Sequence, residues 1–116
     1  IRRRQVLVDA REASLARVGA MLDRAGWSLG PGSPHAEALG RALDALDDVE
    51  HPISDAMLDA YAEAWGPVAA REVAGVDAGD VETSAEAAVV GTLLQEPVVL
   101  AVRRIAQENA SRERGR

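Results

Sequence analysis

Residues 15–46 read LARVGAMLDRAGWSLGPGSPHAEALGRALDAL, and this stretch decides the fold class. Its first part is a helical apolar repeat that ends at Gly26, a residue suited to the left-handed turn after a helix. The next residues are rich in Gly, Pro and Ser and predict a loop. Ser33 and Pro34 then suit the cap and first position of a second helix. The stretch therefore predicts two helices joined by a loop.

The rest of the chain continues this pattern. Apolar residues at helical spacing, with cap and stop residues at the ends, predict helices near residues 1–25, 34–47, 55–74 and 84–108. Pro67 and Pro97 fall inside the third and fourth, where a missing N–H and a steric clash favour a kink. We predict an all-α fold, a small bundle of about four main helices with Pro-kinked third and fourth helices. One helical domain would span 1–108, and 109–116 would be a charged flexible tail.

Composition and charge exclude several classes of function. The chain has a net charge of −6, which opposes phosphate binding by this segment. It contains no cysteine, so disulfides and thiolate metal sites are excluded. The most apolar stretch, 87–102, includes Gln95, Glu96 and Pro97 and is too short to span a bilayer. We also find no signal peptide, and we expect a cytoplasmic protein that does not enter membranes.

We find no arrangement of residues typical of an active site or a metal centre. His51 lies near Asp47, Asp48 and Glu50, which could hold a divalent ion, but a lone histidine makes an acidic helix end the better interpretation. No serine has a nucleophile-elbow context and no glycine-rich loop follows a strand. A small enzyme with converging arginines ranks last, because the arginines concentrate at the two ends of the chain. We expect no enzymatic activity, no metal and no cofactor.

Large side chains concentrate at one place in the third helix. Met57, Tyr61 and Trp65 are four residues apart and share a helix face, and Trp27 is the remaining aromatic residue. The four could line a pocket for an apolar small molecule, with polar handles from the phenol and the indoles. The alternative, which we rank slightly ahead, is that they are the large members of an Ala/Leu core. The sequence leaves both interpretations open.

The first predicted helix carries a stripe that could pair with a second copy of the chain. The stripe repeats at heptad spacing, and a four-helix core of this size would leave part of it uncovered. The predicted dimer interface consists of Ile1, Val8, Leu15, Val18 and Leu22.

Several stretches in order resemble a known family. The V-V-G-T-L-L segment followed by R-R-I-A-Q-E is the most distinctive of them. Over most of 13–108 the chain resembles the C-terminal half of MerR-type transcriptional regulators from actinobacteria. The matching stretches are MLDRAGW (21–27), ALGRALDAL (38–46), YAEA (61–64), AVVGTLL (88–94) and LAVRRIAQE (100–108).

The resemblance implies a function. Such regulators have an N-terminal winged helix–turn–helix that binds promoter DNA, and a helical C-terminal part that dimerises and can bind an effector. The chain would be that effector-sensing or dimerisation domain, a homodimer with an apolar effector, reaching promoter DNA only through a domain before Ile1. The cysteines of metal-sensing members are missing, so metal sensing is not expected. The alternative is a stand-alone helical interaction module without a ligand.

Overall fold

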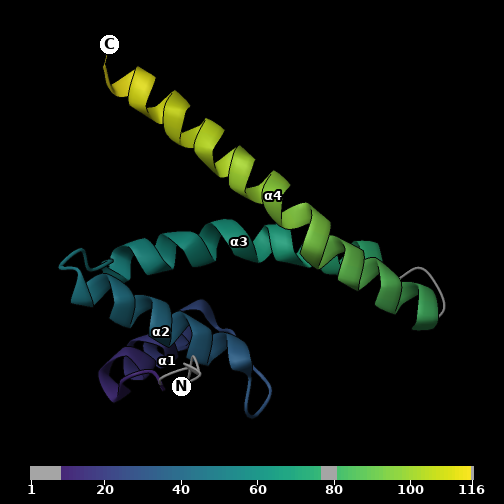
Figure 1. Cartoon of the computed structure of the whole chain (residues 1–116), viewed down its shortest axis with the longest axis horizontal. Helices are drawn as coiled ribbons and strands as arrows, with labels where there is room; N and C mark the ends of the chain where they lie inside the picture. The colour runs from purple at the N-terminus through teal and green to yellow at the C-terminus, as the bar shows by residue number, and fades with distance from the viewer. Residues whose placement is uncertain (1–8, 77–80, 116) are drawn as a thin grey trace, which may run out of the picture. The chain divides into compact units, whose positions relative to one another are not determined.

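The computed structural model of the chain describes residues 9–76 and 81–115, with side chains for 9–75 and 94–115. These residues form four α-helices and no strand, which confirms the all-α prediction (Figure 1). The helices are α1 (Glu12–Ala25), α2 (Pro34–Asp48), α3 (Asp55–Val76) and α4 (Val81–Arg114). The chain divides into two compact units, Ile1–Val68 and Ala69–Arg116, which are described separately.

The core of the first unit lies where α1, α2 and the start of α3 meet. Helices α1 and α2 lie side by side (Figure 1). Val18 and Met21 of α1 are buried with Leu43 of α2 and Leu58 of α3. Burying such side chains stabilises a fold by roughly 1.5–3 kcal/mol each. Four partly buried residues pack around this cluster: Leu22, Ala36, Leu39 and Ile53.

Two polar side chains lie on the apolar faces of α1 and α2 and bond to each other. Ser14 shares its helix face with Val18 and Met21, and Asp44 shares its own with Gly40 and Leu43. Only 3% of Ser14 and 9% of Asp44 are exposed. The Ser14 hydroxyl donates to Asp44 Oδ1. Each group therefore satisfies the other, which removes the cost of burying either of them alone.

The same carboxylate holds the beginning of α1. The Arg11 N–H donates to Asp44 Oδ2 at 2.9 Å, and the Ala10 N–H donates to Glu37 Oε1 at 2.6 Å. The first backbone N–H groups of a helix have no partner within it, and a carboxylate also suits the positive end of the helix dipole. Arg11 returns a side-chain bond of 2.6 Å to Asp48. Arg11, the N-cap residue of α1, makes no side-chain cap bond, and the carboxylates of α2 instead bind its N–H and that of the preceding Ala10.

The predicted first helix over 1–25 is therefore too long. Residues 9 and 10 are not helical, and Arg11 is extended, with φ −66° and ψ 149°. The N–H groups of Ala10 and Arg11 bond to carboxylates of α2, and apolar spacing along α1 cannot reveal partners about thirty residues away. Residues 1–8 lie outside the described part, and so do Ile1 and Val8 of the predicted dimer stripe.

The remaining helices are longer than predicted. Pro67 and Pro97 lie inside α3 and α4, and neither proline ends its helix. Helix α4 begins at Val81, ahead of the expected start near 84. It continues to Arg114, so residues 109–114 are helical where we predicted a flexible tail. In the second unit, Leu94, Val98 and Ile105 share one helix face and are exposed.

Two glycines of the first unit should respond in opposite ways to alanine. A Cβ at Gly40 would lie 2.8 Å from Ala10 Cβ and 3.0 Å from Leu15 Cδ2, whereas one at Gly19 would meet nothing within 4 Å. Steric crowding by the added methyl group should destabilise the fold by about 1–3 kcal/mol, and the higher helix propensity of alanine should stabilise it by about 1 kcal/mol. Gly40→Ala should therefore destabilise the protein by about 1 kcal/mol. Gly19→Ala should stabilise by about 0.5–1 kcal/mol. Urea unfolding measures both, and equal effects would contradict the close approach of Ala10 to α2.

The Asp44 carboxylate should make stability fall in acid. The hydrogen bonds from the Ser14 hydroxyl and then from the Arg11 N–H lower the pKa of Asp44 below its ordinary 3.8. The pKa of Asp44 is lower in the folded state than in the unfolded state. The ionised carboxylate therefore stabilises the fold fully above about pH 4, and this stabilisation is lost as the pH falls through the folded-state pKa. Asp44→Asn should lower stability at pH 7 and flatten the loss between pH 4 and 2. Urea unfolding across that range tests this, with Asp47→Asn, an exposed substitution in the same helix, as control. An unchanged pH profile in Asp44→Asn would refute it.

Candidate functional site

A tight turn after α1 places Trp27 next to the helix that precedes it. Gly26 has φ +72° and donates its N–H to the Asp23 carbonyl, while Trp27 N–H donates to the Leu22 carbonyl at 2.9 Å. These two bonds form a Schellman motif, which commonly brings the residue after the glycine against the last turn of the helix. Trp27 and Leu22 accordingly line the same cavity.

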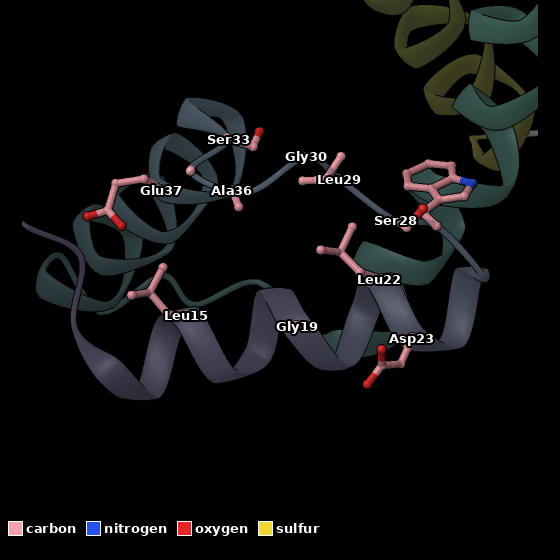
Figure 2. Close-up of a pocket in the computed structure, with 12 residues that line it drawn as sticks. Leu15, Gly19, Leu22, Asp23, Ser28, Leu29, Gly30, Ser33, Ala36 and Glu37 are labelled. Atoms are coloured by element: carbon pink, nitrogen blue, oxygen red, sulfur yellow. The ribbon is translucent and has the colours of Figure 1, made fainter.

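The larger of the two cavities described in the first unit is largely open to solvent and lies between α1, the loop 27–33 and the first turn of α2. Its volume is about 530 Å³. Figure 2 shows Leu15 and Leu22 extending from α1 on the side that faces Ala36 and Leu29. Gly19 lies between the two leucines, and a Cβ there would meet nothing within 4 Å. The backbone of α1 at Gly19, midway along the helix, is therefore accessible from the cavity.

Polar groups also line this cavity. They belong to Ser28, Ser33, Asp23 and Glu37, and in Figure 2 the Asp23 carboxylate lies on the opposite side of α1 from Leu22 and Leu29. The Ser33 hydroxyl accepts the His35 N–H at the start of α2. One oxygen of Glu37 already accepts the Ala10 N–H, and Arg41 lies 3.7 Å from it. No arginine lines the cavity in the described part of the chain. The lining therefore combines apolar side chains with hydrogen-bond acceptors and negative charge.

The arginines of α1 are engaged on another side of the helix. Arg17 pairs with Asp55 at 2.8 Å and donates to the Ile53 carbonyl at 2.6 Å. Arg24 pairs with Asp59 at 2.9 Å. Both pairs join α1 to α3 or to the segment just before it. This arrangement leaves the cavity side of α1 without positive charge.

A second, smaller hollow also has Trp27 in its lining. Its volume is about 280 Å³, and its lining residues are Arg24, Ala25, Trp27, Asp59, Ala62 and Glu63. The indole of Trp27 also lies against α3, since a Cβ at Gly66 would be 3.4 Å from its Cζ2 atom. Trp27 therefore borders both hollows and contacts the helix that carries the other aromatic residues.

The structure brings only one of the four predicted pocket residues to these hollows. Trp27 lines both, whereas Met57, Tyr61 and Trp65 line neither. Met57, Tyr61 and Trp65 are 45%, 39% and 38% exposed, so they are not fully buried core side chains. They lie beside the buried face of α3, which presents Leu58 and Ala62 to the core. A ligand site at these three residues stays a prediction.

Part of the predicted dimer stripe contributes to the core of its own chain. Val18 is 2% exposed and belongs to the central cluster. Leu22 packs against that cluster, and Leu15 lies close to Gly40 of α2. Leu15 and Leu22 also line the larger cavity. Dimerisation through this stripe stays a prediction. Val18 is already buried by residues of its own chain and is not available to a partner.

Sequence reasoning missed most of the cavity. Leu15, Gly19 and Leu22 follow one another at three- and four-residue spacing, so their shared face was available from the helical period. Leu29, Ala36 and Glu37 carried no such signal, because a loop of irregular conformation decides where they meet α1. Gly19 gave no signal for a cavity, because a glycine within a helix indicates only a lower helix propensity.

The described residues contain no candidate metal centre and no candidate membrane-spanning helix. No group of three or more His, Cys, Asp or Glu side chains there is arranged to hold a metal ion. His51 follows Glu50, a residue in the left-handed region at φ 59°. No helix in this part of the chain combines the length and apolar character needed to cross a bilayer.

Comparison with known proteins gave no relative. No protein-family model, no curated protein and no solved structure matches the chain.

The turn that positions Trp27 can be compared with a second one at the end of α2. There Glu50 N–H donates to the Asp47 carbonyl and His51 N–H to the Leu46 carbonyl, so Glu50 occupies the place of Gly26. The left-handed conformation costs a non-glycine residue about 1–2 kcal/mol. Gly26→Ala should therefore destabilise by about 1 kcal/mol, and Glu50→Gly should stabilise by about 0.5 kcal/mol once the more flexible unfolded chain is included. Thermal unfolding checks both, and a stabilising Gly26→Ala would contradict the turn.

Proposed function

We propose that this chain is the effector-sensing or dimerisation part of a MerR-type transcriptional regulator. It would form a homodimer in the cytoplasm, respond to an apolar small molecule and have no enzymatic activity. Promoter DNA would be bound by a winged helix–turn–helix that precedes Ile1 in the regulator.

Two kinds of observation support this proposal. The first is the resemblance of 13–108, above all the segments at 88–94 and 100–108. The second, which carries the sensing role, is the cavity of about 530 Å³ beside Trp27, whose size suits a small molecule. The net charge of −6 supports a role in which this part of the protein does not itself touch DNA.

A stand-alone interaction module is the second candidate. It is favoured by the exposed apolar face of α3, where Met57, Tyr61, Trp65 and Val68 are all more than a third exposed. Contiguous apolar faces of this kind often mark protein–protein contacts. The two candidate functions predict different coding sequences next to this segment. The regulator requires a DNA-binding domain in the same polypeptide, whereas the interaction module does not.

The coding sequence upstream of Ile1 and a DNA-binding measurement together test the proposal. We expect a winged helix–turn–helix in frame before Ile1, and binding of the longer product to its own promoter with strong salt dependence. The 116-residue chain alone should not retard the same duplex, since its acidic surface repels phosphate. Tight, salt-sensitive DNA binding by the chain alone, or a different domain upstream, would refute the regulator proposal.

A further inference from the structure

We infer that the cavity between α1, the loop 27–33 and α2 binds an apolar small molecule whose head group donates hydrogen bonds. This inference deepens the proposed function, on which it rests for its regulatory meaning, by locating the effector site and naming its ligand class. The binding itself belongs to the first unit and can be measured without DNA.

The apolar half of the inference rests on the lining. Leu15 and Leu22 of α1 face Leu29 and Ala36 across this space in Figure 2. Trp27 is a further lining residue. A volume of about 530 Å³ falls within the range of roughly 300–1,000 Å³ that ligand sites usually have. Gly19 keeps the middle of α1 free of a side chain, so a ligand could approach the helix backbone there.

The nature of the head group follows from the polar atoms of the lining. The ionisable residues of the lining, Asp23 and Glu37, are both acids, and Ser28 and Ser33 are hydroxyls that can accept. Glu37 accepts the Ala10 N–H and lies 3.7 Å from Arg41, and Ser33 accepts the His35 N–H, so Ser28 and the second lone pairs of these oxygens are the acceptors open to a ligand. The positive charges of Arg17 and Arg24 are paired with α3 carboxylates. A hydroxyl or ammonium group would find acceptors here, whereas a carboxylate would meet like charge.

Three probes with one apolar body separate these possibilities: 1-adamantanemethanol, 1-adamantanemethylamine and adamantane-1-carboxylate. The chain has two tryptophans, so Trp65→Phe leaves Trp27 as the sole indole reporter at the cavity. The probes do not absorb where tryptophan is excited. We expect the alcohol and the amine to produce a saturable change in Trp27 emission. The carboxylate should bind more than about tenfold more weakly, because like charges repel across the lining.

Matched leucine substitutions test whether the response comes from this cavity. Gly19→Leu places a side chain in the open space and should weaken binding of the alcohol by at least about tenfold, since packed space excludes the ligand. Gly75→Leu is the control, because Gly75 is also helical, has nothing within 4 Å of an added Cβ and lies outside the lining. Leu29→Ser, at an exposed loop position, should also weaken binding without disturbing the core.

The results that would overturn the inference are distinct from failure of the regulator proposal. No change in Trp27 emission with any probe, an unaltered response in folded Gly19→Leu, or equal binding of the carboxylate would each refute the site or its ligand class. Circular dichroism of each variant shows that it is folded. If the probes bind as expected but no winged helix–turn–helix precedes Ile1, the site stands and the regulatory role does not.

Discussion

The first unit depends on one carboxylate that is shared between two helices. Asp44 of α2 accepts the Ser14 hydroxyl and the Arg11 N–H, and so joins the core face of α1 to its N-terminal end. Because these bonds have defined directions, they fix where α1 begins and how it is rotated against α2. Apolar packing of Val18 and Met21 against Leu43 supplies most of the free energy but would tolerate other rotations. The carboxylate selects one of them.

That rotation also decides what the remaining faces of α1 can do. With Ser14, Val18 and Met21 turned into the core, Leu15, Gly19 and Leu22 come to lie beside the loop and α2. Gly40 permits the close approach of α2, because its missing side chain leaves room for Ala10 and Leu15. The first turns of α1 pack closely against α2, whereas the loop 27–33 passes over the C-terminal end of α1. The cavity is the space between these two regions.

The sequence was informative for features that depend on nearby residues. The end of α1 at Ala25, the start of α2 at Pro34 and the start of α3 at Asp55 follow from Gly26, Ser33 and Ser54. Helix capping involves residues within one turn, so it can be read locally. The start of α1 was missed for the opposite reason, since its cap is Asp44. The extent of α4 was missed because charged residues after Ala106 are equally compatible with an exposed helix.

By itself, the sequence determined an all-α chain, the caps and stops of its helices, the absence of thiol chemistry and a net negative charge. These properties follow from residue identity and from the 3.6-residue period. Only the tertiary structure decided that Trp27 borders a cavity that Met57, Tyr61 and Trp65 do not line, although all four side chains are more than a third exposed. The physical reason is that α3 carries apolar residues around much of its circumference, so its own pattern does not select a buried face. Packing of Leu58 and Ala62, together with the ion pairs from Arg17 and Arg24, made that selection.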